Sequence, residues 1–105
     1  MPGIDFRAVR VLVSMTDVLQ LIGYPIPAAR PDRLRGPCPI HRSRSSNSRS
    51  FAVHVSRKMF RCFGCGSAGN HLDLYAAVTH QAVHQAAVDL CDKLLLEIPW
   101  LHPKG

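Results

Sequence analysis

The chain has 105 residues, the length of one domain, and an ordinary globular composition with 47% apolar and 7% aromatic residues. Its formal net charge is +6, and residues 30–61 hold nine cations and one acid, so this segment carries +8 and the remainder −2. The start of the chain lacks a secretion signal and its strongest apolar stretch is too short to span a bilayer, so we expect a cytosolic location.

The first third of the sequence predicts two short helices. Residues 5–13 carry apolar side chains at helical spacing. Residues 17–23 predict a second helix, with Thr16 as its N-cap and Gly23 at its C-terminal end. Three prolines between positions 25 and 31 then break the regular pattern, and the chain enters an extended region.

The middle of the sequence predicts β structure. Residues 50–56, SFAVHVS, alternate apolar and polar positions, which is typical of a half-buried strand. Residues 57–62, RKMFRC, follow after a short connection, so we expect a hairpin between the two. Residues 42–50 contain no apolar side chain and predict a mobile, solvated loop.

The last third of the sequence predicts two helices. One begins after the pair Gly69 and Asn70 and carries apolar residues at helical spacing. A longer helix follows from about Val83 and ends before Pro99. No internal repeat and no second domain are indicated.

Three of the four cysteines lie in two short motifs with the spacing of metal ligands. Cys38 and His41 are separated by two residues, and so are Cys62 and Cys65, with twenty residues between the pairs. Such pairs form turns whose ligands suit tetrahedral zinc. In a cytosolic protein, closely spaced cysteines are metal ligands more often than disulfides. We therefore predict one zinc site formed by these four residues.

Other interpretations of these residues remain open. The thiols could be unrelated buried side chains or form a reducible disulfide, and iron could replace zinc, although the imidazole ligand favours zinc. His71 is the alternative to His41 because it follows Cys65 closely, but it lies outside the paired spacing. Cys91 lies among apolar residues of the last helix, where a small buried thiol is the favoured interpretation.

The zinc site is expected to be structural. Four protein ligands fill the coordination shell of zinc and leave no position for a reactive water. Gly64 and Gly66 are expected to give the second turn the positive φ that such turns need. The binding energy, about 10 kcal/mol, is comparable to the entire stability of a small domain. We therefore expect the middle third of the chain to be largely unfolded without the metal.

The motifs around the cysteines are similar to those of a known protein family. The motifs CPIH, SF at the start of a strand, and FRCFGCGSAGNHLDLY resemble the N-terminal zinc-binding domain of bacterial DnaG-type DNA primases. The helices before and after the zinc site are also similar to those of the family, and Cys91 falls at an alanine-like position. The matching residues are Cys38, Pro39, His41, Ser50, Phe51, Cys62, Phe63, Cys65, Gly66, Gly69, Asn70 and Asp73.

The resemblance implies an α+β fold of the zinc-ribbon type, in which a small antiparallel sheet is flanked by N-terminal and C-terminal helices. We expect a single domain over residues 1–105, with the zinc core at about 33–75 and helices within about 5–22 and 70–97. In the family this domain helps to bind single-stranded template and to start RNA primers. The implied partners are single-stranded DNA and a primase polymerase domain or replicative helicase on another chain.

The sequence departs from the family in two ways. The loop between His41 and Ser50 is longer than usual, is rich in arginine and serine, and lacks the usual proline before the strand. The acidic cluster of the Toprim-type polymerase domain, which would hold the magnesium ions of nucleotidyl transfer, is not found in this chain. We therefore expect no primer synthesis from this chain alone.

The basic segment surrounds both cysteine pairs and the hairpin, which is the electrostatic footprint of a nucleic-acid-binding surface. A base could stack on Phe60 or Phe63, although packing inside the protein is the alternative for each. Arg49 and His54 are further candidate contacts. The expected phosphate contacts are Arg33, Arg35, Arg42, Arg44, Arg57, Lys58 and Arg61, with Phe63 as the stacking residue.

Three functions are compatible with these patterns. The favoured one is a template-binding zinc domain of primase type that acts with a polymerase domain. The second is a zinc-stabilised DNA-binding regulator without a priming role, for which specific duplex binding would be the sign. The third is a protein-interaction module whose basic face meets an acidic partner, which failure to bind any nucleic acid would favour.

Overall fold

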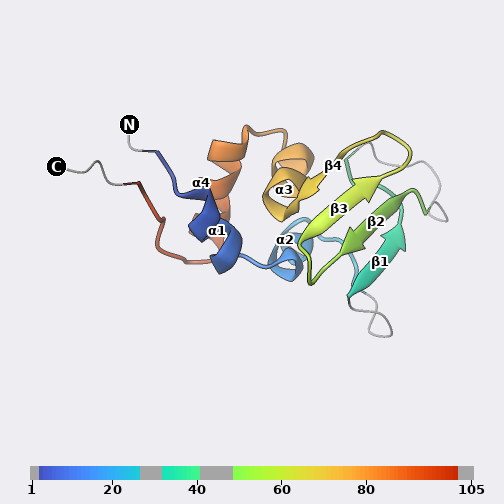
Figure 1. Cartoon of the computed structure of the whole chain (residues 1–105), viewed down its shortest axis with the longest axis horizontal. Helices are drawn as coiled ribbons and strands as arrows, with labels where there is room; N and C mark the ends of the chain where they lie inside the picture. Colours follow the sequence, from blue (N-terminus) through green and yellow to red (C-terminus); the bar gives the residue numbers. More distant parts are fainter. Residues whose placement is uncertain (1–2, 27–31, 41–48, 102–105) are drawn as a thin grey trace.

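The computed structural model describes residues 3–26, 32–40 and 49–101. Its elements in chain order are α1 (Phe6–Leu12), α2 (Met15–Leu21), β1 (Arg33–Gly36), β2 (Phe51–His54), β3 (Met59–Cys62), β4 (Ala68–Asn70), α3 (His71–Thr79) and α4 (Val83–Lys93). The molecule is elongated and measures 53 × 26 × 20 Å. The sheet occupies one end, α1 and α4 the other end, and α2 and α3 the middle (Figure 1). A sheet with helices before and after it confirms the expected α+β class.

Local capping fixes where the two N-terminal helices begin. The carboxylate of Asp5 caps α1. At the start of α2, the Ser14 hydroxyl accepts a hydrogen bond from the Asp17 amide at 3.0 Å, and the Asp17 carboxylate accepts one from the Ser14 amide at 3.1 Å. The prediction that Thr16 caps this helix is therefore wrong, because the reciprocal pair starts the helix two residues earlier.

The sheet is antiparallel in the order β1-β2-β3-β4, and its register separates an apolar face from a basic one. Side chains alternate between the two faces of a strand. The inner face carries Leu34, Phe51, Val53 and Phe60, each at most 5% exposed. The opposite face, referred to below as the outer face, carries Arg33, Arg35, Ala52, His54, Met59 and Arg61.

The predicted hairpin is confirmed as β2 and β3, joined by a turn in which Lys58 has a φ of 55°. The sequence indicated only an extended region where β1 forms, and no strand where β4 forms. β1 has a single apolar side chain, Leu34, and β4 spans three residues, so neither carries enough alternation to predict a strand. Both strands form because they pair with the two edges of the hairpin.

The two C-terminal helices are also confirmed. α3 begins at a capping box in which the Asn70 amide oxygen accepts from the Asp73 amide and the Asp73 carboxylate accepts from the Asn70 amide, both at 3.0 Å. α4 buries Ala86, Leu90 and Cys91 among other residues. It ends at Lys93, somewhat before the expected limit of about residue 97.

A polar cluster joins α3 to α4 at the middle of the molecule. The Tyr75 hydroxyl donates to the Asp89 carboxylate at 2.5 Å and accepts from the Lys93 amine at 2.9 Å. Lys93 and Asp89 also form an ion pair at 3.3 Å. The side chain of Tyr75 is buried, and these bonds satisfy its hydroxyl, the one polar atom that it carries.

The beginning and the end of the described chain pair with each other at the helical end (Figure 1). Ile4 and Trp100 form an antiparallel bridge, and the Leu101 amide donates to the Gly3 carbonyl at 2.7 Å. Among the helices that the described residues form, none combines the length and apolar character needed to cross a bilayer.

Candidate metal centre and basic outer face

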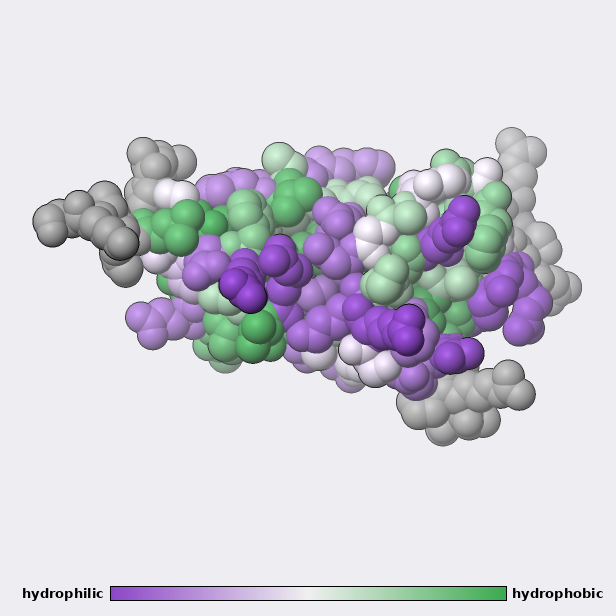
Figure 2. All heavy atoms as spheres, viewed as in Figure 1, coloured by the Kyte–Doolittle hydropathy of each residue, from purple (hydrophilic) through white to green (hydrophobic). Residues whose placement is uncertain are grey.

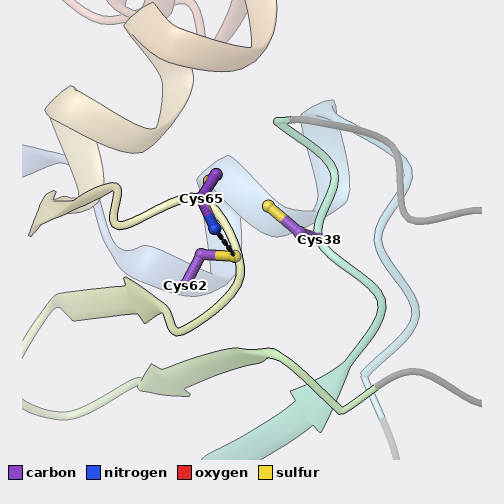
Figure 3. A group of neighbouring side chains, drawn as sticks. All are labelled: Cys38, Cys62 and Cys65. Carbon is purple, nitrogen blue, oxygen red and sulfur yellow. Dashed lines mark hydrogen bonds between the residues drawn. The ribbon is translucent and has the colours of Figure 1, made fainter.

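Three cysteine sulfurs converge at the end of the sheet. Cys38 follows β1 by two residues, Cys62 is the last residue of β3, and Cys65 lies in the turn that leads to β4. Their Sγ atoms all lie within 4.8 Å of one another, and Figure 3 shows the side chains directed toward a common space. The strand register explains the convergence, because Gly36, Phe51 and Cys62 are neighbours in one row of the sheet.

Both cysteine turns have amides that donate to sulfur. The Ile40 amide donates to Cys38 Sγ and the Cys65 amide donates to Cys62 Sγ, each at 3.4 Å. Gly66 has a φ of +77°, and its amide donates to the Cys62 carbonyl to close the second turn. Gly64 is not in the left-handed region, so the expectation of positive φ is right for Gly66 and wrong for Gly64.

The surroundings of Cys62 favour the thiolate that a metal requires. Burial of the Cys62 thiol opposes its ionisation, but hydrogen bonds from the Cys65 amide, the Cys38 and Cys65 thiols and the Gly64 amide outweigh burial and lower its pKa to about 7. A tetrahedral zinc ion with Zn–S bonds of about 2.3 Å would hold its sulfurs about 3.8 Å apart. The three sulfurs, which lie within 4.8 Å of one another, are therefore close to the spacing that zinc would impose.

The fourth predicted ligand, His41, lies outside the described residues, so its place at the metal stays a prediction. The chain reaches Ile40 with the thiol of Cys38 already turned toward the other two sulfurs. The part of the site that the structure describes is therefore a three-cysteine cluster, with Cys38 and Cys62 buried and Cys65 exposed.

The two rival ligands lie elsewhere in the described structure. Cys91 is buried in α4, outside the cysteine cluster, and burial raises the pKa of its thiol, which confirms the interpretation as a packing residue. His71 is fully buried in α3 and is also outside the cluster. Burial, and then the nearby charge of Lys58, lower the pKa of His71. Backbone groups of Val13 and Arg10 partly oppose this shift of the His71 pKa, although neither makes a hydrogen bond of good geometry with the ring.

The outer face of the sheet forms a hollow of about 800 Å³. Arg33 and Arg35 from β1 and Arg61 from β3 lie on it at alternate strand positions, and Arg49 and Arg57 line it from the flanking turns. Among the residues that line the hollow there is no carboxylate. In Figure 2, several of the most hydrophilic residues (purple) lie over the sheet half of the molecule, beside apolar ones (green).

Phe60 and Phe63 have opposite environments. Phe60 is 5% exposed and packs 5.9 Å from Phe51, so it belongs to the core. Phe63 is 60% exposed, and the guanidinium groups of Arg35 and Arg61 lie 5.4 and 5.1 Å from its ring centroid. The position next to Cys62, at the end of β3, holds the ring of Phe63 beside the basic hollow.

The structure does not bring all the predicted phosphate contacts to one surface. The Lys58 amine donates to the Arg10 carbonyl at 2.5 Å, at the C-terminal end of α1, and Lys58 does not line the hollow. Arg42 and Arg44 lie outside the described residues. The predictions for these three residues therefore remain predictions.

The structure places Arg49, which the sequence already offered as a candidate contact, and adds Met59, which the sequence analysis did not name. Arg49 lines the hollow, and its carbonyl accepts two hydrogen bonds from Arg35, at 3.1 and 2.5 Å. Met59 is 55% exposed on the outer face, directly opposite His54 in the register. The signal for Met59 was its place in RKMFRC, where the burial of Phe60 requires both neighbours to point outward.

Comparisons with known proteins agree with this site. The family model for the CHC2 zinc finger, the zinc ribbon of DnaG, matches residues 4–104. The chain is 30% identical over 99 residues to a DNA primase of Treponema pallidum, which covers 93% of this chain and 16% of that primase. It is 31% identical over 88 residues to a DNA primase of Synechocystis, which covers 83% of this chain and 13% of that primase.

A third DNA primase, from Mycolicibacterium smegmatis, is 32% identical over 95 residues, which covers 89% of this chain and 14% of the primase. The chain thus spans between 13% and 16% of the length of these three curated relatives. In each case the similarity extends over most of this chain and not over the cysteine motifs alone.

Proposed function

The chain belongs to the CHC2 zinc-finger family of DnaG-type DNA primases, and on this premise we propose that it binds single-stranded DNA template during RNA primer synthesis. The observation that carries the proposal is the exposed ring of Phe63 with two guanidinium groups beside it, at the edge of a hollow lined by five arginines. Such a surface offers stacking to an unpaired base and charge to the phosphates on either side of it.

One zinc ion is proposed at Cys38, Cys62 and Cys65, with His41 as the fourth ligand. The ion would supply a fixed cross-link between the end of β1 and the end of β3. Phe63 follows Cys62 directly, and Arg35 lies three residues before Cys38, so the same cross-link would hold the stacking ring and its neighbouring cation in place. The role proposed for the metal is structural.

A single strand is a better match for this face than a duplex. A base can stack on Phe63 only when it is unpaired, because the bases of a duplex already stack on each other. The proposed phosphate contacts are Arg33, Arg35, Arg49, Arg57 and Arg61, all of which line the hollow. Five neutralised phosphates would give log K a salt slope of about −3.5, at about 0.7 per phosphate on a single strand.

The test is a titration of labelled single-stranded DNA with the zinc-loaded chain at several salt concentrations. Replacing Arg35 or Arg61 with alanine should reduce the salt slope by about 0.7 each. Arg7→Ala is the matched control, because this substitution removes the same charge from an exposed position on α1, at the helical end of the molecule. Equal affinity at all salt concentrations, tighter binding to a matched duplex, or no binding would contradict the proposal.

Polymerisation is proposed to depend on a primase polymerase domain that these 105 residues do not contain, and a replicative helicase is a second proposed partner. The chain alone is expected to make no primers. Primer synthesis would be measured with the polymerase domain of a relative in the presence and absence of this chain. Stimulation that Phe63→Ala abolishes would support the proposal, and stimulation independent of the outer face would contradict it.

A further inference from the structure

His54, the last residue of β2, lies on the outer face and makes its recorded contacts through one ring nitrogen. Its Nδ1 atom receives the amide of Arg57 at 3.4 Å and lies 3.3 Å from the Ser56 hydroxyl. The Asp32 carboxylate is 3.9 Å from the same atom. An amide N–H can only donate, so Nδ1 must accept, and the proton of the neutral imidazole therefore lies on Nε2.

This arrangement offers one donor to a ligand in the hollow. Within the described residues, every contact recorded for the ring of His54 is at Nδ1. The side chain is 27% exposed and lines the hollow. His54 therefore supplies an N–H group of fixed orientation and cannot accept a hydrogen bond from a ligand without losing its contact to the Arg57 amide.

The neighbours of His54 in the same row complete a small recognition surface. Arg33 lies directly across from it on β1, and Met59 lies directly across on β3. A guanidinium group has donors and no acceptor. The thioether of Met59, 55% exposed, offers a polarizable apolar surface on which an aromatic ring can pack. The row thus presents donors on one side and an apolar contact on the other.

We propose that Arg33, His54 and Met59 form a base-recognition subsite that prefers guanine to adenine. The proposal rests on the template-binding function proposed above. Guanine presents two adjacent acceptors, N7 and O6, on one edge, whereas adenine presents the acceptor N7 beside the donor N6. The two polar members of the row, Arg33 and His54, offer donors, which match the two acceptors of guanine and place a donor against the N6 donor of adenine.

The test uses the zinc-loaded chain and fluorescently labelled oligothymidylates of about twelve nucleotides, long enough to fill one such groove. One central thymine is replaced by guanine, adenine, cytosine or 7-deazaguanine. Guanine should bind about tenfold more tightly than adenine. The 7-deaza base lacks the N7 acceptor and should lose most of that advantage.

Two variants separate recognition from folding. His54→Phe keeps an aromatic ring without a donor, and it should abolish the guanine preference while the salt slope stays unchanged, because no charge is removed. His54→Gln offers a donor and an acceptor together, and it should shift the preference toward adenine. His84→Phe is the matched control, because His84 lies on α4 between Phe6 and Trp100 and should leave the preference intact.

The proposal is overturned if the wild-type chain binds the four substituted oligonucleotides equally, or if it prefers cytosine to guanine. It is also overturned if His54→Phe retains the guanine preference while its zinc content and circular dichroism match those of the wild type. Equal binding would leave the template-binding function standing. Failure of the zinc-loaded chain to bind any oligonucleotide would instead overturn both, so the two failures are distinguishable.

Discussion

At the scale of single residues, the two phenylalanines near Cys62 have different roles: Phe60 packs in the core, and Phe63 is the proposed stacking residue. Phe60 points inward and packs against Phe51, whereas Phe63 follows the sheet at the cysteine turn and remains exposed beside Arg35 and Arg61. The sequence left both as candidates for base stacking, with packing inside the protein as the alternative for each. The strand register decides between them, since it places residue 60 and not residue 63 in the inner row.

Phe63→Ala should weaken the binding of single-stranded DNA by about 1–3 kcal/mol, or roughly 5-fold to 150-fold, because the stacking surface is lost. The melting temperature should change little, since the ring is 60% exposed. The control is Val11→Ala on α1, where an exposed apolar side chain is removed from the other end of the molecule. Anisotropy titrations measure the affinity, and an unchanged affinity for Phe63→Ala would remove this ring from the interface.

At the scale of elements, the junction between β4 and α3 depends on a glycine. Gly69 has a φ of +153°, and a Cβ at this position would lie 2.5 Å from Asp73 Oδ2. The same carboxylate accepts the Asn70 amide in the capping box of α3. A side chain at Gly69 would therefore strain the backbone and also displace the group that starts the helix.

Gly69→Ala should lower the free energy of unfolding by about 3 kcal/mol, from backbone strain together with the damaged cap. Gly23→Ala is the matched control, because Gly23 also has a positive φ, +74°, but has no atom within 4 Å of its Cβ position. Gly23→Ala should lower the free energy of unfolding by only about 1 kcal/mol. Thermal melts of the zinc-loaded proteins compare the two, and equal losses would show that the contact with Asp73 is unimportant.

The elements also show what the sequence could and could not predict. The hairpin and the two C-terminal helices carry clear periodic patterns, and all three are confirmed. β1 and β4 are held by pairing with the hairpin, which is a tertiary effect that no local pattern reveals. For α2, Thr16 and Ser14 are both good N-cap residues, and the choice depends on the residue three positions later. Asp17 stands three positions after Ser14, and its carboxylate accepts a hydrogen bond from the Ser14 amide.

At the scale of the whole molecule, the sheet and the helices have different sources of stability. The sheet end is small, and its outer face carries charge instead of apolar cover. The helical part has its own buried residues and the polar cluster of Tyr75, Asp89 and Lys93. The cysteine cluster therefore lies where the fold has the greatest need of a cross-link.

Removal of zinc by a chelator should destabilise the sheet far more than the helices. A structural zinc ion contributes about 10 kcal/mol, comparable to the stability of an entire small domain. Hydrogen exchange should show loss of amide protection in β1–β4 first, with α3 and α4 retaining theirs longest. If chelation left the circular dichroism and the melting temperature unchanged, the structural role of the metal would be refuted.

Cysteine variants provide the controls for this experiment. Cys91→Ala should retain one zinc ion per chain, because Cys91 lies outside the cluster, whereas Cys38→Ala should lose it. Zinc content after gel filtration measures the difference. The cluster itself was predictable from spacing alone, while the buried environment of Cys91 was predictable only from its apolar neighbours in the helix.

The pairing of the first and last described residues has a practical consequence for how this domain can be handled. Gly3 and Leu101 are joined by a backbone hydrogen bond at the end of the molecule remote from the sheet (Figure 1). A dye, a solid support or a fused protein attached at either side of this junction would stand away from the basic hollow. Such attachment should leave the path of an incoming strand clear, so the domain suits surface-tethered measurements of single-molecule residence time.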